Sequence, residues 1–161
     1  MSKVEERLRS LGLVLPGVVK VPQGQSRPFV FVNMRGDRAF VSGHGPREAD
    51  GSLARPLGQV GGVVSLDEAR VLARKSALAM LSSLRRELGD LDRITGWCRV
   101  FGMVNSAPGF DRQTEVINGF SETIVDAFGA EIGRHARSAV GMSGLPLGFA
   151  VEVEAEVMIA S

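Results

Sequence analysis

A long amphipathic segment, Ser65 to Gly89, constrains the fold of this chain more than any other stretch. Ser65 and Glu68 have the spacing of a capping box, which begins a helix, and Gly89 is a typical residue at a helix end. Between them, apolar and small side chains recur at helical spacing: Ala69, Leu72, Ala73, Ser76, Ala79, Met80, Ser83 and Leu84. Because the side chains on this face are small as well as apolar, we expect the helix to lie closely on a β-sheet.

The segments around this helix predict the other elements of an α+β fold. Two strand-like runs precede the helix, one long run follows it, and a second long helix and two further strands complete the chain. The predicted elements are strands at 29–33, 38–42 and 94–104, a helix from the N-cap Asp111 through Phe128 that closes at Gly129, and two strands within 133–157. Runs of adjacent strands with only two long helices indicate one mixed sheet with both helices on one face.

The N-terminal residues predict an addition to this core. Ser2 and Glu5 have capping-box spacing and predict a short helix through Ser10, and a connector rich in proline and glycine follows. A chain of 161 residues suits one domain. We therefore predict a single domain, 1–161, in which 1–27 form an N-terminal helix and connector extension.

The second face of the sheet is left uncovered by two helices. Alternation in the last strand places Val151, Val153 and Ala155 on one face and the glutamates on the other, and Ala139 belongs with the apolar set. A sheet face without helices is either solvated or buried by another chain. We expect homo-oligomerisation through this face.

Composition excludes several classes of function. The formal net charge is +1, which argues against nucleic acid as a partner. One cysteine rules out an intramolecular disulfide framework, and His44 and His135 lack the spacing of a zinc site. The chain lacks an apolar run long enough to span a membrane and does not begin as a signal peptide, so we expect a cytoplasmic protein without a membrane partner.

Arg137 and Glu152 are the strongest candidates for a site. If the turn at Gly144 to Pro146 pairs the last two strands antiparallel, the two side chains lie nearly opposite each other. An arginine beside a carboxylate can hold a carboxylate ligand and position a water molecule, and the contact would lower the pKa of Glu152. The alternative is that both are solvated charges of an edge strand, as is common in sheets.

Four segments carry a resemblance to a known family: "ARSAV", "LPLGFAVEVEAEV", "VSGHGP" and "VINGF". Over about residues 28–160 the chain resembles the YjgF/RidA family, also labelled L-PSP endoribonuclease, and its N-terminal helix and "NSAPGF" resemble the longer branch. The resemblance implies a chorismate-mutase-like fold, a homotrimer and ligand clefts between subunits. It also implies hydrolysis of reactive enamines and imines of amino-acid metabolism to 2-oxo acids and ammonia, without metal or cofactor.

The resemblance also assigns roles to five residues. Arg137 matches the arginine that binds the substrate carboxylate, and Glu152 matches the glutamate that holds the hydrolytic water. Gly43 matches a backbone lining of the pocket, and Ala139 matches a small pocket residue that is often cysteine. Phe29 stands where active deaminases often carry tyrosine, so the hydroxyl is absent here.

Two other functions remain open at the level of sequence. The same intersubunit cleft could bind a small carboxylate metabolite without chemistry, which the Phe29 departure favours. Endoribonuclease activity is the third hypothesis. It is disfavoured by the near-neutral net charge and by the lack of a sequence pattern of aromatic and basic residues that would form a groove for RNA.

Overall fold

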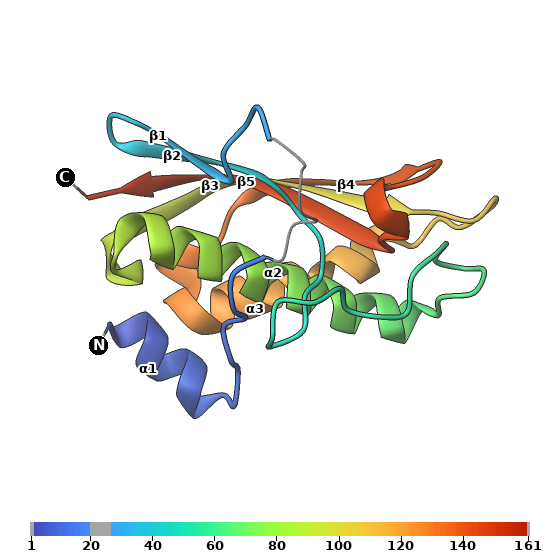
Figure 1. Cartoon of the computed structure of the whole chain (residues 1–161), viewed down its shortest axis with the longest axis horizontal. Coiled ribbons are helices and arrows are strands. Elements are labelled where there is room, and N and C mark those ends of the chain that lie inside the picture. The colour runs from blue at the N-terminus through green and yellow to red at the C-terminus, as the bar shows by residue number, and fades with distance from the viewer. Residues whose placement is uncertain (1, 20–26, 161) are drawn as a thin grey trace.

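The computed structural model describes residues 2–19 and 27–160, which form two layers, a five-stranded sheet and a layer of helices on one of its faces (Figure 1). The elements in chain order are α1 (Lys3–Ser10), β1 (Val32–Arg35), β2 (Arg38–His44), α2 (Leu66–Leu88), η1 (Leu91–Arg93), β3 (Ile94–Asn105), α3 (Gln113–Gly133), β4 (Ala136–Met142), η2 (Pro146–Gly148) and β5 (Val151–Ile159). The expected α+β class and the two long helices on one face are confirmed.

The strand order is β1-β2-β5-β3-β4, and it overturns one expectation. The last two strands do not pair, because β3 lies between them, parallel to β4 and antiparallel to β5. The crossover helix α3 returns the chain to the end of the sheet where β3 began, so β4 can only run parallel to β3. The segment at Gly144 to Pro146 is therefore a bridge across the end of β3, where the amide of Asn105 donates to Ala150 and that of Ser106 donates to Met142.

The two long helices differ in how they begin. The capping box of α2 is present, with the Ser65 hydroxyl accepting from the Glu68 amide and the Glu68 carboxylate accepting from Ser65. In α3 the N-cap is Arg112, not Asp111, and no side chain caps it. Gly129 interrupts the regular helix with φ of 78°, as expected for its end, but a further turn follows to Gly133.

The first hairpin is shifted along the chain relative to the prediction. β1 begins at Val32, so Phe29 precedes the strand, and β2 extends past Ser42 to His44. The segment before β1 still follows β2, because the Ser42 amide donates to the Phe31 carbonyl and the Ser42 hydroxyl donates to the Val30 carbonyl at 2.7 Å. A register shift between Val41 and His44 marks a bulge at this point.

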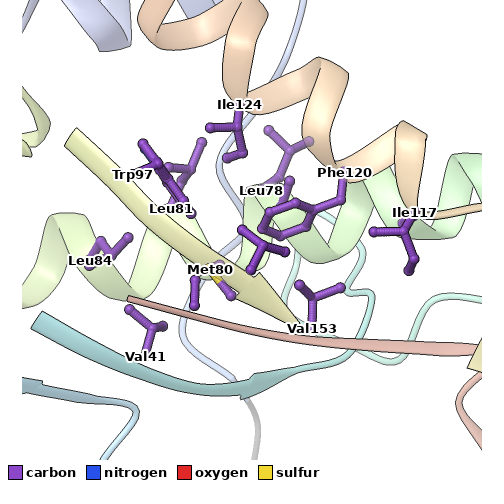
Figure 2. Packing of buried hydrophobic residues seen from close by; sticks show 14 of the residues in the cluster. Val41, Leu78, Met80, Leu81, Leu84, Trp97, Ile117, Phe120, Ile124 and Val153 are labelled. Atoms are coloured by element: carbon purple, nitrogen blue, oxygen red, sulfur yellow. The ribbon is translucent and has the colours of Figure 1, made fainter. Parts of the chain in front are cut away.

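The hydrophobic core fills the space between the sheet and the two long helices (Figure 2). Phe120 and Met80, from α3 and α2, meet the sheet residues Trp97, Val41 and Val153, and all five are almost fully buried. On the strands, the apolar positions of β5 face this core as expected.

α1 is docked on the far side of the helix layer, away from the sheet (Figure 1). Val4 and Leu8 are buried in the common core cluster, and the Asp92 carboxylate accepts hydrogen bonds from the amides of Lys3 and Val4 at 2.9 and 3.0 Å. This carboxylate satisfies two of the amides that a helix N-terminus leaves free, so α1 is tied to η1.

The opposite face of the sheet carries no helix of the described chain (Figure 1). It exposes large side chains, among them Phe40 at 43% and Met158 at 40%, and it is hollowed to about 690 Å³ beside Phe29, Phe101 and Glu154. We call this surface the open face. None of the helices in the part of the chain that the structure describes has the length and apolarity to cross a membrane.

Candidate functional site

Arg137 and Glu152 lie on opposite faces of the sheet. Arg137 pairs with Val100 of β3, which is fully buried under the helices, and paired residues share a face. Glu152 stands between the buried Val151 and Val153 and so points to the open face. The expected contact between Arg137 and Glu152 within one chain is therefore wrong, because β3 separates their strands.

The first half of the candidate site is built around Arg137 at the outer edge of the sheet. The guanidinium donates from Nη1 to Asn118 Oδ1 at 3.0 Å and to Ser121 Oγ at 2.9 Å, and from Nη2 to the Thr114 carbonyl at 3.3 Å. Ala139 lies two residues further on the same face of β4. We call this group, with Arg137 at its centre, the arginine half-site.

The charge of Arg137 is only partly compensated in this setting. All three acceptors are neutral oxygens, and among the described residues Arg137 forms no ion pair. Burial lowers the pKa of Arg137 and outweighs the nearby Glu122, which raises it. A half-buried guanidinium without a carboxylate partner is well suited to bind an anion, because the anion would restore the missing charge.

The second half of the candidate site is built around Glu152 on the open face. The backbone of Gly43 passes so close that a Cβ there would overlap Oε1 of Glu152, so a larger residue at this bulge of β2 would displace the carboxylate. Burial raises the pKa of Glu152, and the neighbouring Glu154 raises it further. The expected lowering of this pKa is therefore wrong, since Arg137 is on the other face. We call Glu152 and Gly43 the glutamate half-site.

Phe29 lies at the margin of the open face rather than in a strand. Its side chain is 54% exposed, and its ring packs edge-on against Phe31 with centroids 6.1 Å apart. Phe29 lines the hollow of the open face together with Glu154, so the structure places it on the same side of the sheet as Glu152.

His44 supports the bulge that carries Gly43. Its Nδ1 donates to the Ser42 carbonyl at 2.6 Å, so Nε2 is free of a proton and accepts from the Ser83 hydroxyl at 2.9 Å. The oxygen of Ser83 in turn accepts from Arg86 at 3.0 Å. Burial lowers the pKa of His44 to about 4, with nearby Arg86 and Arg47 acting in the same direction and the Ser42 carbonyl opposing them.

The sequence did not predict three residues of the arginine half-site as site residues: Asn118, Ser121 and His135. Asn118 and Ser121 are three residues apart, on one face of α3, and His135 immediately precedes β4. Helical spacing could have paired the first two, but only the fold brings them to Arg137. Within residues 2–19 and 27–160, no group of three His, Cys, Asp or Glu side chains could hold a metal ion.

Comparison with known sequences gives one clear relative. Protein TCP17 from Trypanosoma cruzi is 38% identical to this chain over 155 residues, which cover 96% of this chain and 93% of TCP17. No family model matches the chain.

Comparison with solved structures agrees with the fold. Atu1372 from Agrobacterium tumefaciens, a protein of unknown function, has a TM-score of 0.88 and 37% identity, and the match covers 98% of this chain and 93% of Atu1372. A Shewanella oneidensis protein whose description proposes an endoribonuclease has a TM-score of 0.85 and 26% identity, with coverage of 97% and 99%. YyfA of the Rid family, from Yersinia pestis, shares the fold at 17% identity with a TM-score of 0.59, and the match covers 89% of this chain and 98% of YyfA. The similarity to these relatives shows that the chain belongs to the L-PSP/YjgF/Rid family.

Proposed function

We propose that this protein hydrolyses small imines or enamines adjacent to a carboxylate, giving a 2-oxo acid and ammonia. The observation that carries the proposal is the state of Arg137, a half-buried guanidinium held only by neutral oxygens at the edge of the sheet. A substrate carboxylate supplies the charge that this group lacks, and a planar guanidinium can bind it through two parallel hydrogen bonds.

The two half-sites require assembly. Neighbouring strands in a sheet are about 4.8 Å apart, so β4 and β5, which flank β3, are about 10 Å apart. The side chains of Arg137 on β4 and Glu152 on β5 also point to opposite faces of the sheet. One small ligand reaches both residues only if the arginine half-site of one copy meets the glutamate half-site of the next. We propose a closed threefold ring of identical subunits in which the open face is buried and each cleft takes one half-site from each neighbour.

The chemistry needs little beyond orientation. Arg137 holds the carboxylate, and water adds to the carbon of the protonated imine, forming the new C–O bond while the C=N electron pair moves to nitrogen. An enamine first takes up a proton at its β-carbon and so gives the same protonated imine. Glu152 accepts a proton from this water and returns it to the amine of the carbinolamine. The carboxylate then takes the remaining hydroxyl proton as the C=O bond forms and ammonia leaves. Glu152 suits this role because its carboxylate lies on the open face beside the Gly43 backbone, where it can accept a proton from a bound water and return it.

A second candidate function is binding without turnover. Phe29 and Ala139 offer apolar walls without a hydroxyl or thiol, so the cleft would orient a ligand mainly through Arg137. Such a site would bind a 2-oxo acid as a ligand rather than release it as a product. For endoribonuclease activity the support is weaker, because the open face intersperses arginines with Glu154 and Glu156 rather than presenting a continuous basic strip.

The test is to add freshly generated 2-iminopropionate to the purified protein and to follow ammonia and pyruvate. We expect release above the spontaneous rate by the wild type and by Arg134→Ala, an exposed arginine nearby, and only the spontaneous rate with Arg137→Ala. Background release with tight binding of 2-oxobutyrate would favour the binding function. Light scattering should give about three times the 17.2 kDa chain mass, and a stable monomer would refute the shared cleft.

A further inference from the structure

Ser121 contacts both Arg137 and His135 at the arginine half-site. Its oxygen accepts from Arg137 Nη1 at 2.9 Å and lies 2.9 Å from His135 Nε2. The other ring nitrogen, Nδ1, is 2.7 Å from the Gly133 carbonyl. The three side chains come from α3, from the residue before β4 and from β4 itself, so the contact joins the helix layer to the edge of the sheet.

The direction of each hydrogen bond follows from the donors and acceptors. A carbonyl oxygen only accepts, so His135 Nδ1 carries a proton, and in the neutral ring Nε2 then carries a lone pair. The Ser121 hydroxyl must then donate to Nε2, which leaves its lone pairs for the Arg137 guanidinium. Without His135, the hydroxyl could rotate and direct its proton toward the guanidinium, which cannot accept one.

The surroundings of His135 keep this arrangement neutral. Burial lowers the pKa of His135, the Gly133 carbonyl opposes the shift, and the charge of Arg137 adds to it. The ring also packs beside Trp97, with centroids 6.4 Å apart, so it is held from α3, from β3 and from its own segment.

We propose that His135, acting through Ser121, is a positioning residue that fixes the Arg137 guanidinium in the orientation that binds the ligand carboxylate. The proposal rests on the proposed function, since it assumes that Arg137 binds a carboxylate. It adds that the orientation depends on one serine hydroxyl whose proton is directed by a neutral imidazole. The same order of groups, arginine to serine to histidine to carbonyl, recurs at Arg86, Ser83, His44 and Ser42.

The test is a double-mutant cycle read by calorimetric titration of 2-oxobutyrate into the full-length protein. Ser121→Ala should weaken binding about tenfold, as for loss of one hydrogen bond to a charged group, and Ser121→Thr, which keeps the hydroxyl, should restore most of the affinity. His135→Phe should resemble Ser121→Ala, whereas His135→Gln, whose amide oxygen can still accept, should lose less. In an Arg137→Ala background, Ser121→Ala should cause no further loss.

The controls separate the positioning role from a general effect on the fold. Ser76→Ala removes a buried helix serine whose hydroxyl has no partner, and it should bind as the wild type does. An equal loss from Ser121→Ala with and without Arg137, or full affinity in both Ser121→Ala and His135→Phe, would overturn the proposal while leaving the carboxylate site intact. If Arg137→Ala binds as tightly as the wild type, or if the wild type binds no 2-oxo acid, the proposed function fails and this inference fails with it.

Discussion

The buried imidazole of His44 should make the stability of this protein fall in mild acid. In the folded protein its pKa is about 4, whereas the ordinary value is 6.5. The unfolded chain therefore takes up a proton first as the pH falls, and the folded state cannot follow until the pH approaches 4. The stabilisation is present above about pH 6.5 and is lost as the pH decreases toward 4.

The size of the effect follows from the two pKa values. Between pH 7 and pH 5 the difference in proton uptake amounts to about 2 kcal/mol of unfolding free energy, and the full shift corresponds to about 3 kcal/mol. For a chain of this size such a loss is a large fraction of the total stability. The variant His44→Gln keeps polar contacts with its neighbours but does not titrate, so it should lack this part of the pH dependence.

The measurement is urea unfolding of wild type and His44→Gln at pH 7, 6 and 5, at one protein concentration and one ionic strength. Trp97 is the single tryptophan and is 4% exposed, so its fluorescence reports unfolding. Other titrating groups, including His135, are common to both proteins and cancel in the difference. We expect the wild type to lose about 2 kcal/mol more than His44→Gln between pH 7 and pH 5. Parallel losses in the two proteins would show that His44 is not held neutral, and the reasoning would be refuted.

Three further predictions concern the half-sites and the N-terminal helix. Gly43→Ala should preserve the fold but displace the Glu152 carboxylate, so turnover of 2-iminopropionate should fall by at least about tenfold with the melting temperature nearly unchanged; wild-type turnover would contradict the close approach. Glu152→Gln should bind 2-oxobutyrate within a few-fold of the wild-type affinity but lose turnover of 2-iminopropionate. If the variant instead loses mainly its affinity for 2-oxobutyrate, Glu152 has no role in proton transfer. Asp92→Ala should weaken the attachment of α1 by roughly 1 kcal/mol, seen as faster amide exchange in Lys3–Ser10 but not in α2, and unchanged exchange there would refute the capping role.

Local signals predicted the helices well. The capping box at Ser65 and the glycine at position 89 are signals that involve only a few neighbouring residues. Both ends of α2 lie where these residues predict them. Asp111 failed as an N-cap because Arg112, which pairs with Glu115, takes that position without a side-chain cap. A helix start without a capping side chain leaves little trace in the sequence.

The arrangement of the strands was less predictable, because it depends on contacts distant in the sequence. The turn before Pro146 resembles a hairpin when read locally, and only the crossover by α3 shows that β4 pairs with β3. The expectation that Arg137 and Glu152 lie opposite each other failed for the same reason. Alternation of side chains is visible within one strand, but whether residues of two strands share a face depends on their register with β3. The polar partners of Arg137 are likewise brought together by the fold alone.

Arg137 and Glu152 lie on opposite faces of the sheet, so under the proposed function no subunit carries a complete site of its own. Two defective proteins should then be able to repair each other. In rings assembled at random from equal amounts of Arg137→Ala and Glu152→Gln subunits, one boundary in four joins an intact arginine to an intact glutamate, so about a quarter of wild-type activity should return. Under the proposed function, the catalytic unit is the boundary between two copies of one chain.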